Sequence, residues 1–144
     1  MINSDTIDLL QQCNIGIKMG VTTIDNVIDN VTDDAFRSLL NSSKEEHQRL
    51  GSETHDMLNK YHDETKEPSP MAKTMTWMKS NVMISMKDSD NTVADLVTDG
   101  CNMGVKTLNK YLNQYEAAEE RAKDIAKKLI NMEEKLAVDI RQYL

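Results

Sequence analysis

Residues that interrupt helices are scarce in this sequence. Its 144 residues include only five glycines and two prolines, and aromatic residues make up 4% of the chain. It also lacks the run of about 18 apolar residues that a membrane-spanning helix needs. Because apolar residues recur at three- and four-residue steps almost throughout, we expect one all-α domain over residues 1–144, without a membrane span.

Basic residues are outnumbered by acidic ones, 17 to 24, which gives a net charge of −7. This balance argues against nucleic-acid binding, which relies on lysine and arginine to neutralise phosphates. The first residues, MINSDTIDLLQQCN, lack the basic start and uninterrupted apolar core of a signal peptide. The only cysteines, Cys13 and Cys101, are expected to be buried thiols in a reducing compartment. We therefore predict a cytoplasmic protein.

Periodicity and capping residues predict four main helices and one short one. Thr32 is expected to cap the second helix, and the stretch DETKEPSP is expected to form a loop before the short helix. The inward row of the second helix is apolar at both ends and polar in the middle, where Ser43, His47 and Thr54 lie. The expected helices span residues 4–30, 33–62, 71–86, 92–113 and 117–143.

The sequence GIKMGVTTI, from Gly16, is repeated 84 residues later as GCNMGVKTL, from Gly100, with five of nine positions identical. A second register, 88 residues apart, aligns CNIGIK with CNMGVK. The repeat lies on the first and third main helices, so we predict an up-down four-helix bundle of two pseudo-symmetric αα-hairpins. Glycine within a helix costs about 1 kcal/mol relative to alanine, so these glycines are expected to serve packing. The expected helix-packing residues are Cys13, Gly16, Gly20, Gly100, Cys101 and Gly104.

The paired-hairpin plan, with SKEEHQRLGSETHDML in the second helix and LINMEEKLAVDIRQYL in the last, resembles the ferritin-like superfamily. The similarity is greatest to small bacterial four-helix-bundle proteins of unknown function. Members with a metal site hold two iron or manganese ions with a carboxylate from each of two helices and a Glu-x-x-His motif from each of the others. The resemblance thus implies a ferritin-like bundle and a place to look for a metal site.

The carboxylate pattern of such a site is incomplete in this sequence. No Glu-x-x-His motif occurs, and the first helix has no acidic residue from Leu9 to Ile24. We therefore expect neither a metal nor another cofactor, and no catalytic constellation is found. The alternative is an unusual ferritin-like metal-binding or redox protein that holds iron or manganese with Glu46, His47, Glu53, Glu133 and Glu134.

Two further features have a structural and a functional interpretation. His47 is expected to be a half-buried histidine with its hydrogen bonds satisfied, while Lys18, Lys106 and the glutamates point to water; alternatively, a lysine replaces the metal of relatives. The segment from Met71 to Lys87 has five methionines, three lysines and no acid. Core packing is its favoured interpretation, against a Cu(I) site, a lipid-binding helix or a partner groove.

These observations favour a non-enzymatic binding or structural protein. Its expected partner is another protein or a second copy of the chain in a homodimer.

Overall fold

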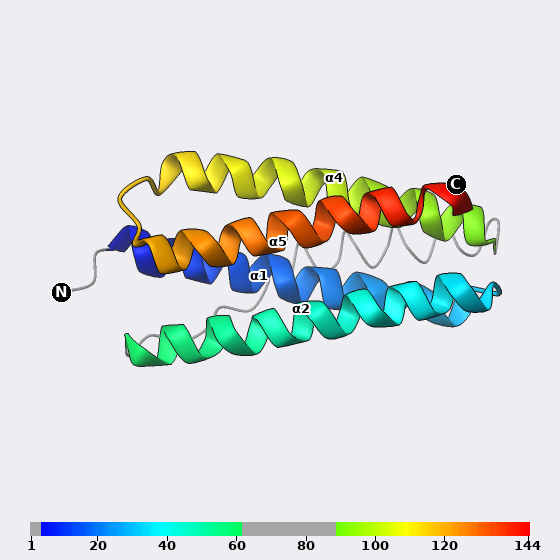
Figure 1. The fold of residues 1–144 in the computed structure, drawn as a ribbon, viewed down its shortest axis with the longest axis horizontal. Helices are drawn as coiled ribbons and strands as arrows, with labels where there is room; N and C mark the ends of the chain where they lie inside the picture. The colour runs from blue at the N-terminus through cyan, green and yellow to red at the C-terminus, as the bar shows by residue number, and fades with distance from the viewer. Residues whose placement is uncertain (1–3, 62–88) are drawn as a thin grey trace.

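The computed structural model describes residues 4–61 and 89–144, which form an all-α four-helix bundle, as the sequence predicts (Figure 1). The short helix expected over 71–86, and with it the interpretations of its methionines, lies outside the described residues. No helix in the described ranges is long and apolar enough to cross a membrane. The four helices are α1 (Ser4–Val27), α2 (Asp34–Lys60), α4 (Asp90–Gln114) and α5 (Glu120–Asp139), and 3₁₀ turns follow α1 (Ile28–Asn30) and α5 (Arg141–Tyr143).

The predicted starts of the four main helices are right to within three residues, but one cap differs. Asp33, and not Thr32, caps α2 by accepting a hydrogen bond from the backbone N–H of Phe36 at 2.9 Å. Thr32 instead donates its backbone N–H to a carboxylate oxygen of Asp90 at 2.8 Å, which joins the start of α2 to the start of α4. The carboxylate of Asp90 therefore lies at the positive ends of two helices, α2 and α4, at once.

Contacts at the helix ends define the directions of the helices. The starts of α2 and α4 meet at the Thr32–Asp90 contact, and the starts of α1 and α5 meet where Glu119 donates its N–H to the hydroxyl of Thr6 at 2.8 Å. Helices α1 and α5 thus run one way and α2 and α4 the other (Figure 1). The order is up, down, down, up, so α2 ends and α4 begins at opposite ends of the bundle. The expected up-down bundle alternates throughout, so the four-helix bundle is as predicted but α4 runs parallel to α2. Periodicity predicted the helices and their faces, but it carries no information on their directions.

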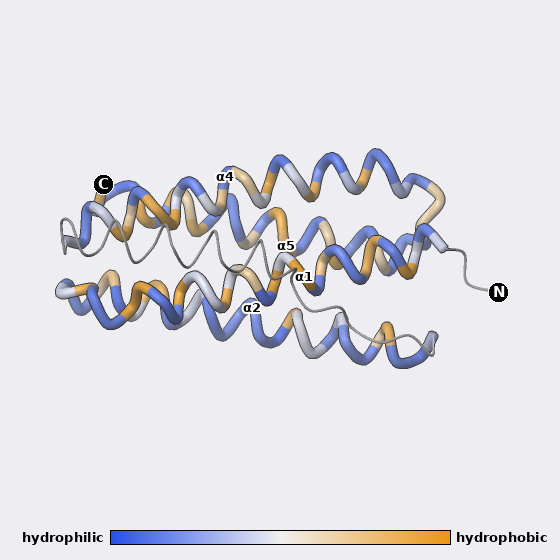
Figure 2. Tube along the Cα trace, turned by 180° about the vertical axis from the view of Figure 1, so that it is seen from behind, coloured by the Kyte–Doolittle hydropathy of each residue, from blue (hydrophilic) through white to orange (hydrophobic). Residues whose placement is uncertain are grey.

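The core is divided into two apolar clusters along the bundle. The inward row expected for α2 is buried from Phe36 to Met57, and Tyr61 is half-buried. Figure 2 shows hydrophobic residues recurring at short intervals along every helix, as the amphipathic pattern requires. One cluster includes Leu9, Leu10, Leu58, Ile125 and Leu129, and the other includes Val27, Phe36, Leu40, Val93 and Ile140. Ser43 and His47 of α2 lie between these clusters, whereas Thr54 lies between Leu50 and Met57, which both belong to the first cluster.

Candidate functional site

A histidine and a glutamate from different hairpins meet between the two apolar clusters. His47 of α2 is 2% exposed and Glu133 of α5 is 8% exposed, and the imidazole Nε2 lies 3.5 Å from Glu133 Oε1. Ionisable side chains are rarely buried to this degree unless they are paired. The pair forms a polar layer between the two apolar clusters.

The other imidazole nitrogen shows how this layer holds its proton. His47 Nδ1 lies 2.7 Å from the backbone oxygen of Ser43, and a carbonyl oxygen can only accept, so Nδ1 carries hydrogen. If the imidazole were neutral, the lone pair of Nε2 would face the carboxylate of Glu133, and the two would repel each other. A second proton, held between Nε2 of His47 and Glu133, removes this repulsion and is therefore favoured. Burial lowers the pKa of His47, but the hydrogen bonds with Glu133 and the Ser43 carbonyl, together with the negative charges of Glu133 and Glu46, outweigh it and raise the pKa above its usual value.

Two glycines make room for this pair, one on each side. A Cβ at Gly20 of α1 would lie 3.0 Å from His47 Cδ2, and a Cβ at Gly104 of α4 would lie 2.7 Å from Glu133 Oε2. Each glycine thus faces the polar side chain on the following helix of its own hairpin. Any larger residue at either position would have to displace a member of the buried pair.

The other two repeated glycines are under less constraint. A Cβ at Gly16 would make an ordinary contact, 3.6 Å from Leu129 Cδ2, and a Cβ at Gly100 would meet no atom within 4 Å. No neighbouring side chain therefore requires glycine at Gly100, which is exposed.

Both cysteines are buried free thiols. Burial raises the pKa of Cys13 to about 12. Burial also raises the pKa of Cys101, and the charge of Glu133 and a hydrogen bond with it add to the effect. Thiols in these surroundings are poor nucleophiles, because the reactive thiolate is disfavoured. Cys101 therefore lies close to Glu133 and belongs to the polar layer.

A cavity of about 300 Å³ opens between α1 and α4 and reaches this layer. His47 and Glu133 line it together with the glycines of both repeated stretches. Its apolar lining includes Met19, Ile24, Leu96, Met103, Leu108 and Leu136. Small side chains on α1 and α4 leave space that larger ones would fill, so the repeated glycines help to form the cavity.

The remaining residues proposed for a metal site are not gathered there. Glu134 is exposed, and Glu53 is exposed and pairs with Lys128, with 3.4 Å between Nζ and Oε1. Glu46 is half-buried, and only His47 and Glu133 come together. Among the described residues, no group of three histidine, cysteine or acidic side chains is placed to hold a metal ion. The carboxylate set of the ferritin-like metal site therefore does not fit these residues.

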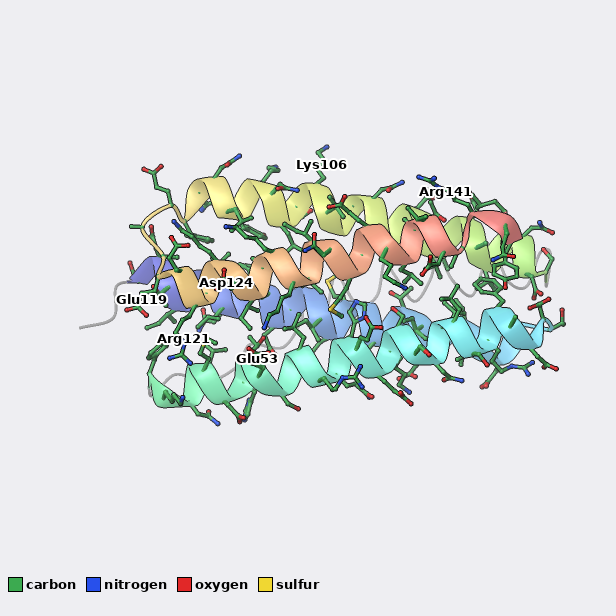
Figure 3. All side chains as sticks on the ribbon, in the orientation of Figure 1. Glu53, Lys106, Glu119, Arg121, Asp124 and Arg141 are labelled. Atoms are coloured by element: carbon green, nitrogen blue, oxygen red, sulfur yellow. The ribbon has the colours of Figure 1, made fainter. Side chains whose placement is uncertain are left out.

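The expected environments of Glu133 and His47 need correction. Glu133 was expected to point to water, but it is buried against His47, which is itself fully buried and not half-buried. Lys106 points away from the bundle (Figure 3), so it does not take the place that a metal has in relatives. Lys18 is half-buried. Glu133 lies four residues after Leu129 and three before Leu136, so the inward spacing itself was the overlooked signal.

Comparison with known proteins relates this bundle to one solved fold. No protein-family model matches the sequence, and no curated protein matches it. A crystal structure of a DUF305 fragment from Deinococcus radiodurans superimposes with a TM-score of 0.75, over 98% of this chain and 95% of that one, at 11% sequence identity. At this identity the likeness concerns the fold alone, so the chain shares an all-helical four-helix bundle with that fragment.

Proposed function

We propose that this chain is a non-enzymatic binding protein whose ligand enters the cavity between α1 and α4. The observation that carries the proposal is a cavity of about 300 Å³ with mostly apolar walls and a buried His47–Glu133 pair in its lining. Ligand pockets of small molecules combine such walls with a few convergent polar groups that set orientation. The polar groups here are engaged with each other, which suits recognition better than bond-making chemistry.

A neutral fluorescent probe tests the proposal. N-phenyl-1-naphthylamine, titrated into the full chain, is expected to bind saturably with increased emission. Gly100→Leu should abolish this signal, because Gly100 lines the cavity and has open space above its Cα into which leucine can extend.

The matched control is Asn102→Leu, which adds the same side chain to an exposed position of α4 that does not line the cavity. It should bind the probe as the natural chain does. Absence of saturable binding, or equal binding by Gly100→Leu and the natural chain, would contradict the proposal.

One exposed residue supports a second role in protein contact. Met103 is 68% exposed and also lines the cavity, so it extends the apolar surface outward. Exposed apolar surface of this kind favours contact with a protein partner or a second copy of the chain. Native mass spectrometry over a range of concentrations tests self-association, with Met103→Lys expected to shift any dimer toward monomer.

A further inference from the structure

We infer that the ligand of this cavity is an organic cation with an apolar body. This inference rests on the proposed function and adds to it the chemical class of the ligand. It follows from which hydrogen-bonding and charged groups the cavity offers, and which it lacks.

The cavity presents carboxylates but no strongly basic side chain. Glu133 lies in its depth and Asp99 on an exposed part of its lining, whereas no lysine or arginine occurs among the described residues that line it. The proton held between His47 and Glu133 offsets the charge of that carboxylate, but the described lining still holds two carboxylates against one histidine, which disfavours an entering anion. The net charge of −7 adds a long-range attraction for cations.

The buried pair itself offers acceptors to a ligand and no donor, while Gln12, Thr23 and Thr107 in the lining can both donate and accept. Both nitrogens of His47 are engaged, Nδ1 with the Ser43 carbonyl and Nε2 facing Glu133. Neither nitrogen is left as a donor for an anionic ligand. The carboxylate of Glu133 has about four lone-pair sites, and its contacts with His47 and Cys101 leave acceptor capacity for an ammonium group.

The walls suit the apolar body of such a ligand and its charged head. Met19 and Met103 offer polarisable thioethers, and Tyr111 offers an aromatic ring in the same lining. Ammonium groups are attracted to the faces of aromatic rings, and methionine adapts to irregular apolar shapes. A compact hydrocarbon carrying one ammonium group therefore matches the lining in both polarity and charge.

Two compounds that share one hydrocarbon body separate charge from shape. Adamantane-1-ammonium and adamantane-1-carboxylate are titrated into the full chain by isothermal calorimetry at pH 7. The ammonium compound should bind at least about tenfold more tightly, as expected for a charged hydrogen bond. Gly100→Leu should weaken the binding of both.

Charge-neutralising variants locate the preference. Glu133→Gln keeps the shape of the side chain and should remove most of the preference for the ammonium compound. Asp99→Asn, at an exposed position, should reduce it by about two- to threefold without threatening the fold. Asp95→Asn is the control, because Asp95 is an exposed carboxylate of the same helix that does not line the cavity.

The outcomes distinguish the two levels of the proposal. Equal binding of the two compounds, or an unchanged preference in both Glu133→Gln and Asp99→Asn, would overturn the cation assignment while leaving the binding cavity intact. Binding of neither compound, together with no probe binding, would overturn the proposed function itself. A dimer that becomes a monomer in Gly100→Leu would identify a second copy of the chain as the occupant and would also overturn the assignment.

Discussion

Replacing two glycines one helical turn apart by alanine should have different effects on stability. Gly100 and Gly104 lie on α4 and both line the cavity. A Cβ at Gly104 would lie 2.7 Å from Glu133 Oε2, while a Cβ at Gly100 would meet nothing within 4 Å. Both variants replace glycine by alanine in the same helix and gain the same helix propensity. The difference between their free energies of unfolding therefore reports the surroundings of the added methyl group.

The magnitudes follow from two opposing terms. Replacing glycine by alanine within a helix gains about 1 kcal/mol of intrinsic propensity. At Gly100 nothing opposes this gain, so Gly100→Ala should raise the free energy of unfolding by up to about 1 kcal/mol. At Gly104 the methyl group must displace the carboxylate of Glu133, which is buried and paired with His47, and overpacking costs about 1–3 kcal/mol. Gly104→Ala should therefore be less stable than Gly100→Ala by about 1–3 kcal/mol.

Urea unfolding followed by circular dichroism measures both variants against the natural chain. If the free energy of unfolding decreases with urea concentration at the same slope in each variant, the differences between midpoints report differences in stability. A second pair on α1 repeats the test: Gly20→Ala should destabilise through His47, and Gly16→Ala should not, because its Cβ would contact Leu129 at an ordinary 3.6 Å. If Gly104→Ala and Gly100→Ala unfold at the same midpoint, the glycine at 104 does not make room for the buried pair.

Three further predictions concern titration, thiol reactivity and metal content. The pKa of His47 is raised in the folded state, so its contribution to stability is fully present below the unfolded-state pKa of about 6.5 and is lost as pH rises through the folded-state pKa. The free energy of unfolding of the natural chain should therefore fall over that range. The same fall is expected in the control variant His55→Gln but not in His47→Gln. Cys13 and Cys101 should react slowly with a thiol reagent in the native state and rapidly in urea; fast native labelling of either would show that it is accessible. Elemental analysis of protein purified without chelator, from cells grown with added iron and manganese, should find well below one ion per chain, and a near-stoichiometric metal that is lost in His47→Ala would contradict the absence of a metal site.

Much of the bundle could be predicted because helical periodicity is a local property. The inward row of α2 was read correctly from Phe36 to Met57, including the polar interruption at Ser43 and His47. Boundaries were less certain where two residues compete for one role. Asp33 and Thr32 can both cap a helix, and the choice depended on Asp90, which lies 58 residues from Thr32 along the chain and engages it.

The candidate site was only half predictable. The absence of acidic residues from Leu9 to Ile24 of the first helix led to the expectation that no metal is bound, and His47 lies on an inward face by spacing alone. Glu133 was missed because a long acidic side chain at an inward position usually turns outward to water. What keeps it inside is a partner from another hairpin and the missing side chain at Gly104, and neither is visible from the neighbouring sequence.

The sequence by itself therefore determined the four amphipathic helices, the polar middle of α2 and the presence of glycines where larger residues would form better helices. These are properties of residue type and spacing over one or two helical turns, where local physics decides. Only the tertiary structure decided that α2 and α4 run in the same direction, that His47 meets Glu133, and that the two repeated stretches line one cavity. Such features depend on which faces of distant helices pack together. Burial of apolar surface drives that packing, but the driving force is non-directional, so no single segment of the sequence shows which faces will meet.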